Sequence, residues 1–191
     1  MLSGGELRVI PARRVNCRWL MRGLILCVMA LAPISLPRSA ARAAEGVQTG
    51  SVTGLRLPRF VSLRFDKTNV REGPTKNHRT SWIYQRAGLP VEIIGEFDTW
   101  RRIRDSEGAE GWVLASLLSG RRTAFVAPWR KADVLPIYAK PGGSEVVAQL
   151  QSGVLANVKT CQANWCHVFG EGFDGFIQQG DLWGVYPEEP I

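Results

Sequence analysis

Short apolar runs alternate with turn residues along most of the chain, and no stretch of twelve or more residues keeps a helical period. The runs have the length of strands, are rich in β-branched and aromatic residues, and are bounded by Gly, Pro, Asn and Asp. The segments ASLL and QGDLW are long enough only for a single helical turn. The pattern therefore predicts an all-β protein built from small barrels or sandwiches. The runs fall into two groups, residues 60–65, 81–85, 91–97, 100–104 and 111–118, then residues 135–139, 145–150, 154–159, 165–169 and 175–183.

The two groups are copies of one pattern. Residues 86–103 align without a gap with residues 151–168, at an offset of 65. Downstream, GWV at 111–113 aligns with GFI at 175–177. Two frames with the same internal spacing predict two repeats of one small β-unit. The matched pairs are Gly88 and Gly153, Val91 and Ala156, Ile93 and Val158, Trp100 and Trp165, and Ile103 and Val168.

Residues 1–43 have the pattern of an export signal. A basic leader precedes an apolar run at 23–36, and the small-x-small sequence at 41–43 is typical of a cleavage site. Pro33 interrupts the run, which is shorter than the roughly 20 apolar residues that a spanning helix needs. We therefore expect a cleaved signal, no stable membrane span afterwards, and a periplasmic or secreted mature protein.

Removing this leader changes the charge balance. Residues 1–43 carry seven Arg and one Glu, which is six of the seven net positive charges of the chain. The remaining 148 residues carry 17 basic and 16 acidic side chains. A nearly neutral mature chain does not support a basic field directed at nucleic acid, so no nucleic-acid partner is expected.

Motifs within the first repeat make the fold prediction more specific. NVREGP, then RAGLPVEIIGEFDTWRRIR, then EGWVLASLL resemble a bacterial SH3-like (SH3b) domain, and the second repeat is a diverged copy in which Tyr138-Ala139-Lys140 replaces the R-E-G sequence and Phe176 replaces the Trp. The layout resembles an exported two-module family of proteobacteria. The resemblance implies two tandem SH3-like β-barrels, a scaffold that serves many partners. We assign a signal peptide to 1–43, a flexible lead-in to 44–56, barrel 1 to 57–120 and barrel 2 to 121–191, with the apolar run at 123–129 as a strand shared by both barrels.

The two cysteines of the second repeat fall on its hairpin. Asp98-Thr99 is the tip of the first hairpin, so the offset places Ala163-Asn164 at the tip of the second. A two-residue turn and a symmetric four-residue loop both pair Cys161 with Cys166. The Cα atoms would lie within about 5 Å, where a disulfide can close. An exported chain meets an oxidising compartment, which favours this disulfide.

Two other interpretations of the cysteines remain open. A free or redox-active thiol pair is disfavoured because the spacing is not C-x-x-C. A metal site is disfavoured because Cys166 and His167 are adjacent on a strand and point to opposite faces. At the matching positions of the first repeat, Glu96 and Arg101 predict a cross-strand ion pair that contributes about 0.2–1 kcal/mol.

Aromatic residues and one basic strand supply the candidate ligand site. Some aromatics must fill barrels this small, and others can line a groove for an extended peptide or glycan. We expect Trp112 and Phe176, which follow Gly in the last strand, in the core. The arginines next to Trp100 can bind a carboxylate or phosphate, or can simply pair with Glu96, Asp98 and Asp105 on a solvated strand. The candidate ligand-binding residues are Trp82, Tyr84, Trp100, Arg101, Arg102 and Tyr138.

The sequence contains few residues that could form a catalytic site. Beyond the leader the only histidines are His78, in a polar loop, and His167, and no Ser or Cys stands with them in a plausible triad. We therefore expect no enzymatic activity, no cofactor and no metal. The sequence predicts an exported, non-enzymatic module that binds cell-wall peptide or glycan, or an envelope protein. The alternatives are a scaffold or assembly factor of an envelope complex and, third, a cell-wall hydrolase or redox enzyme that would use Cys161, Cys166 or His167.

Overall fold

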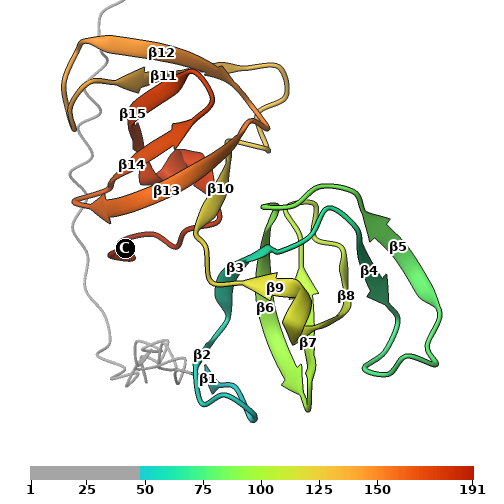
Figure 1. The fold of residues 1–191 in the computed structure, drawn as a ribbon. Coiled ribbons are helices and arrows are strands. Elements are labelled where there is room, and N and C mark those ends of the chain that lie inside the picture. The colour runs from blue at the N-terminus through green and yellow to red at the C-terminus, as the bar shows by residue number, and fades with distance from the viewer. Residues whose placement is uncertain (1–47) are drawn as a thin grey trace, which may run out of the picture. The chain divides into compact units, whose positions relative to one another are not determined.

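The computed structural model describes residues 48–191. The signal peptide predicted over residues 1–43 lies outside the described residues. The described chain forms two seven-stranded antiparallel sheets and one two-stranded hairpin (Figure 1). Its only helices are two single turns of 3-10 helix, so the all-β prediction is confirmed.

The two sheets have the same topology. Their orders are β5-β4-β8-β7-β6-β3-β9 and β12-β11-β15-β14-β13-β10-β16, so each strand of the first has a counterpart at the same place in the second. The first contains β3 (Arg59–Leu63), β4 (Thr68–Arg71), β5 (Thr80–Tyr84), β6 (Pro90–Phe97), β7 (Trp100–Arg104), β8 (Glu110–Leu114), η1 (Ala115–Leu117) and β9 (Leu118–Ser119). The second contains β10 (Thr123–Val126), β11 (Val134–Tyr138), β12 (Val146–Gln151), β13 (Leu155–Gln162), β14 (Trp165–Gly170), β15 (Phe173–Gln178), η2 (Gln179–Asp181) and β16 (Leu182–Trp183).

The central hairpin of each barrel has the predicted register. Phe97 pairs with Trp100 in the first and Gln162 with Trp165 in the second, so both turns contain two residues. Ala163 and Asn164 both have positive φ, 48° and 65°, as a type I′ turn requires. Each turn also accepts an equivalent backbone hydrogen bond. The N–H of Ala115, the first residue of η1, donates to Thr99 O, and the N–H of Gln179, the first residue of η2, donates to Asn164 O, both at 2.8 Å. The duplication therefore extends from the sequence pattern to individual backbone hydrogen bonds.

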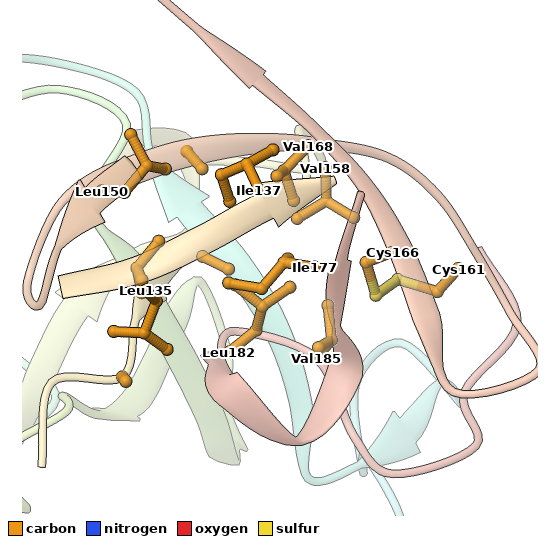
Figure 2. Packing of buried hydrophobic residues seen from close by; sticks show 14 residues of the cluster. Leu135, Ile137, Leu150, Val158, Cys161, Cys166, Val168, Ile177, Leu182 and Val185 are labelled. Atoms are coloured by element: carbon orange, nitrogen blue, oxygen red, sulfur yellow. A yellow bond between two sulfur atoms is a disulfide. The ribbon is translucent and has the colours of Figure 1, made fainter. Parts of the chain in front are cut away.

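Each barrel closes around its own apolar core. In the second, alternate residues of β11, β13, β14 and β15 point inward and pack together with Leu150 of β12 (Figure 2). The expectation that Trp112 and Phe176 lie in the cores is wrong. Both are half-buried, because strand alternation turns the neighbouring Val113 and Ile177 inward instead.

The inward glycine of that last strand is required by close packing. A Cβ on Gly175 would lie 2.7 Å from Tyr138 O and 2.8 Å from Ile137 Cγ2. We expect Gly175→Ala to lower the free energy of unfolding by about 1 to 2 kcal/mol, because backbone must shift to admit the methyl group. Gly180→Ala is the matched control, since a Cβ there meets nothing within 4 Å. Urea unfolding of both variants tests this, and equal stability would contradict it.

Two boundary predictions need correction. The lead-in assigned to 44–56 is not flexible over its described part, because β1 (Gln48–Thr49) and β2 (Arg56–Leu57) form a hairpin. The hairpin is ordered by Glu96, whose carboxylate accepts hydrogen bonds from Val52 N and Thr53 N at 3.0 and 2.9 Å. The run at 123–129 is not a shared strand either. Its β10 pairs only with β13 and β16 of the second sheet.

The barrels nevertheless contact each other through side chains. Thr123 Oγ1 lies 2.8 Å from Ser62 Oγ and donates to Gly88 O at 2.7 Å, both in buried positions. The Phe60 ring contacts Trp183 and Tyr186, with centroids 5.1 and 4.6 Å away. A hydroxyl pair and an aromatic cluster, rather than a common strand, therefore join the two barrels.

Candidate functional site

The outer side of the second barrel carries a row of aromatic rings. Tyr138 on β11, Trp165 and His167 on β14, and Phe176 on β15 all alternate with buried residues, so their side chains leave the core and lie outside the sheet. We call these four residues the aromatic face. The sheet order places β15 between β11 and β14, so the face spans three neighbouring strands.

Ring contacts hold the aromatic face together. Tyr138 and Trp165 meet edge to face with centroids 5.6 Å apart, and His167 stacks on Phe176 at 4.7 Å. His167 Nε2 also contacts Asp174 Oδ1 at 2.5 Å. The surface thus combines half-buried apolar rings with an imidazole and a carboxylate at one side. Such a surface can stack on an apolar ligand face and exchange hydrogen bonds at its margin.

The first barrel has a different surface at the same positions. Arg71 pairs with Trp112 as Tyr138 pairs with Phe176, and Arg102 lies opposite Trp112 as His167 lies opposite Phe176. Hydrogen bonds from Arg104, together with the nearby charge of Arg102, hold the pKa of Glu110 below its ordinary value. The first barrel therefore presents ion-paired guanidinium groups around one Trp, where the second presents rings.

Trp82 and Tyr84, two of the six predicted site residues, help to fill the first barrel. They pack against its core, and Tyr84 donates its hydroxyl hydrogen to Asp105 Oδ2 at 2.8 Å. Burial and this hydrogen bond raise the pKa of Tyr84. Their counterparts in the second barrel, Ala148 and Leu150, also contribute to the core. Trp82 and Tyr84 thus form the partly exposed margin of a core.

Trp100 and Arg101 are buried in the first barrel's structure and are not exposed on a groove. Each residue is 7% exposed. The Arg101 guanidinium donates to Asp98 O at 2.9 Å and lies 3.6 Å from Glu96, so its hydrogen bonds are directed within the protein. Arg102 is exposed and forms a 2.8 Å ion pair with Glu110. The six predicted residues do not converge, and Tyr138 alone belongs to the aromatic face.

Sequence reasoning missed three of the four residues of this face. The sequence pattern predicts Phe176 in the core, aligns Trp165 with Trp100, and gives His167 only as a member of a disfavoured metal site. The period of two was the available signal. Cys166 and Val168 are buried, so the side chains of Trp165 and His167 must point outward.

The two repeats match a known protein family. A family model described as bacterial SH3 domain matches residues 66–120 and again residues 131–184, together more than half of the chain. The chain belongs to the bacterial SH3 domain family. Both repeats are thus bacterial SH3 domains, which are typically binding modules and generally bind cell-wall components. The resemblance seen in the sequence and the prediction of two tandem SH3-like units are confirmed.

Similarity to curated proteins and to solved structures does not extend the family assignment. No curated protein matches the sequence significantly. Two solved structures are similar to parts of the chain, NlpC2 and NlpC1 from Trichomonas vaginalis, with 14% and 16% identity and TM-scores of 0.29 and 0.28. The matches cover 66% and 65% of this chain and 48% and 45% of those chains, so the chain spans about half the length of these proteins. Similarity at this level supports no argument about function.

The second SH3 domain contains the predicted disulfide. Cys161 and Cys166 are bonded across β13 and β14, with Cα atoms 4.1 Å apart. Both residues are fully buried in the core, whereas His167 faces outward, so the three do not converge on one point. Within residues 48–191 no group of three or more possible metal ligands occurs. Nor does any helix in this part of the chain have the length and apolarity to cross a membrane.

Proposed function

We propose that this protein is an exported, non-enzymatic module that binds the glycan strands of the cell wall through the aromatic face of its second SH3 domain. The observation that carries the proposal is that four half-buried rings, in two contacting pairs, lie on three neighbouring strands. The apolar face of a sugar ring packs well on an aromatic ring, whose π-surface is negative and attracts C–H groups. Polar groups at the margin then orient the sugar through its hydroxyl groups. Here Asp174, His167 and Gln178 supply such groups.

The disulfide supports this proposal by stiffening the surface. Cys166 lies between Trp165 and His167 on β14, and its bond to Cys161 anchors this strand from the core side. A site held in its binding conformation loses less side-chain and backbone freedom when the ligand arrives. The export signal predicted at residues 1–43 supports the same proposal, because it would deliver the protein to the periplasm or the exterior, where the wall lies.

Retention on purified cell-wall sacculi tests the proposal. We expect the protein to sediment with sacculi and Trp165→Ala to weaken retention at least fivefold, since loss of a central aromatic anchor costs about 1 to 2 kcal/mol or more. Trp129→Ala is the matched control, because Trp129 is 53% exposed and lies outside the aromatic face. Soluble amino-sugar oligomers should compete with the sacculi.

Three results would count against the proposal. Retention no better than that of an unrelated protein would show that the protein does not bind the cell wall. Equal retention of the Trp165→Ala and Trp129→Ala variants would show that the aromatic face is not the binding site. Capture of one envelope protein in place of sacculi would favour the scaffold alternative. Thermal unfolding of each variant confirms that a loss of retention is not a loss of fold.

A further inference from the structure

A cavity of about 470 Å³ lies where the turn before β6 meets the second barrel. Arg86 contributes from the first barrel, residues 151–155 contribute from the turn between β12 and β13, and Glu171 and Phe173 contribute from the turn between β14 and β15. Its volume is within the range of about 300 to 1,000 Å³ that is typical of small-ligand sites. None of these residues belongs to the aromatic face.

Both copies of one duplicated turn contribute residues to the lining of this cavity. Residues 86–88 and 151–153 are the same turn in the two repeats, related by the offset of 65. Gly88 and Gly153 have positive φ, 78° and 82°, in these turns. The first copy brings Arg86 to the cavity and the second brings Gln151 at the equivalent place. Arg86 is the one lining residue that the first barrel contributes.

Both turns are held in place before any ligand arrives. Ala87 N donates to Asp66 Oδ1 at 3.0 Å, and Gly88 O accepts a buried hydrogen bond from Thr123 Oγ1 at 2.7 Å. In the second copy, Ser152 N donates to Asp133 O at 2.9 Å and Gly153 N to Val126 O at 2.6 Å. Preformed walls reduce the ordering cost of binding.

The cavity offers opposite charges above an apolar floor. Within residues 48–191 the side chains of Arg86 and Glu171 form no ion pair or hydrogen bond, and the side chains of Gln151 and Ser152 form no hydrogen bond. Val154, Leu155 and Phe173 are half-buried and supply the floor. A guanidinium group binds a carboxylate through two parallel hydrogen bonds, and a carboxylate binds an ammonium group.

We propose that this cavity is a second binding site and that it takes a short peptide carrying both a free carboxylate and a free ammonium group. Arg86 binds the carboxylate, Glu171 binds the ammonium group, and the apolar floor contacts the side chains between them. A neutral glycan leaves both charges unpaired, and a phosphate is repelled by Glu171. The inference goes beyond the proposed wall-glycan function and does not depend on it.

Titration of the protein with trialanine, followed by backbone amide NMR, tests this site. We expect saturable shifts that are largest for Arg86, residues 151–155 and Glu171. N-acetyl-trialanine lacks the ammonium group and trialanine amide lacks the carboxylate, and each should bind at least about fivefold more weakly than trialanine. Arg86→Gln, which installs the residue of the second copy, and Glu171→Gln should each weaken trialanine binding by a similar factor. Lys159→Gln and Glu145→Gln remove the same charges elsewhere and should leave it unchanged.

The double variant with Arg86→Glu and Glu171→Arg separates charge pairing from loss of fold. It keeps both charges with their places exchanged, so it should recover trialanine binding relative to either single reversal. Absence of saturable shifts, shifts confined to other surfaces, or binding of either blocked peptide as tight as that of trialanine would each overturn the proposal. Sacculus retention should be unaffected by Arg86→Gln, so the cavity and the aromatic face can fail independently.

Discussion

Replacing Glu96 by Gln is expected to lower the free energy of unfolding by about 3 to 5 kcal/mol. The Glu96 side chain is fully buried and lies 2.7 Å from Arg59 Nη2 and 3.6 Å from Arg101 Nε. It also accepts hydrogen bonds from the hydroxyl of Thr53 and from the backbone N–H groups of Val52 and Thr53. A neutral amide leaves both guanidinium groups without a counter-charge and turns N–H donors toward other donors. The pair that the sequence predicted as a surface contact of modest value is therefore the centre of a buried network.

This loss should depend on pH. Burial alone would raise the pKa of Glu96, but hydrogen bonds from Thr53 and Arg59 outweigh it and lower the pKa to about 2. A carboxylate whose pKa falls on folding stabilises the protein fully at pH values above its ordinary pKa of 4.5, and this contribution is lost as the pH falls toward 2. The difference in stability between the wild-type protein and Glu96→Gln should therefore be largest near neutral pH and shrink below about pH 4.5.

Urea unfolding at a series of pH values measures both parts of this prediction. Glu72→Gln is the matched control, because Glu72 pairs with Arg79 on the surface, where the two side chains are 45% and 82% exposed. An exposed pair contributes less than about 1 kcal/mol, so this control should unfold almost as the wild-type protein does. Equal losses in the two variants would contradict the buried network.

Removing the disulfide should have the second large effect. We expect the variant with both Cys161→Ala and Cys166→Ala to lose about 3 kcal/mol of unfolding free energy. About 2 kcal/mol comes from the cross-link, which closes a short loop, and the rest from the packing of two sulfur atoms. Both cysteines are fully buried beside Val158, Val168 and Ile177 in the core that Figure 2 shows.

Urea unfolding under non-reducing conditions tests the loss. Thr160→Ala, at an exposed neighbouring position of β13, is the control and should change little. An intact mass equal to that of the dithiol form would show that the bond is not made. Unchanged stability in the double variant would show that the bond does not stabilise the fold.

These two predictions concern the same place in the two repeats. Glu96 pairs with Arg101 one step before the first turn, and Cys161 pairs with Cys166 one step before the second. One repeat closes its central hairpin with a buried charge network and the other with a covalent bond. The sequence showed this equivalence because the offset of 65 and the two-residue turns are local properties.

The sequence determined whatever depends on local periodicity and on the internal repeat. The central strands β6 and β7, their copies β13 and β14, the single helical turns after the last long strand of each barrel, and the disulfide all follow from spacing along the chain. Strand alternation even contained the orientation of Phe176, which was missed because an aromatic residue after Gly was assumed to fill the core.

Tertiary structure alone decided which side chains are covered by other segments and which surfaces come together. Arg101 is buried next to Glu96, whose carboxylate also binds a hairpin some fifty residues earlier in the chain. The aromatic face exists because β15 lies between β11 and β14, and the charged cavity exists because Arg86 of the first barrel lies beside residues 151–155 of the second. Each of these depends on contacts between segments far apart in the chain, and such contacts leave no period in the sequence.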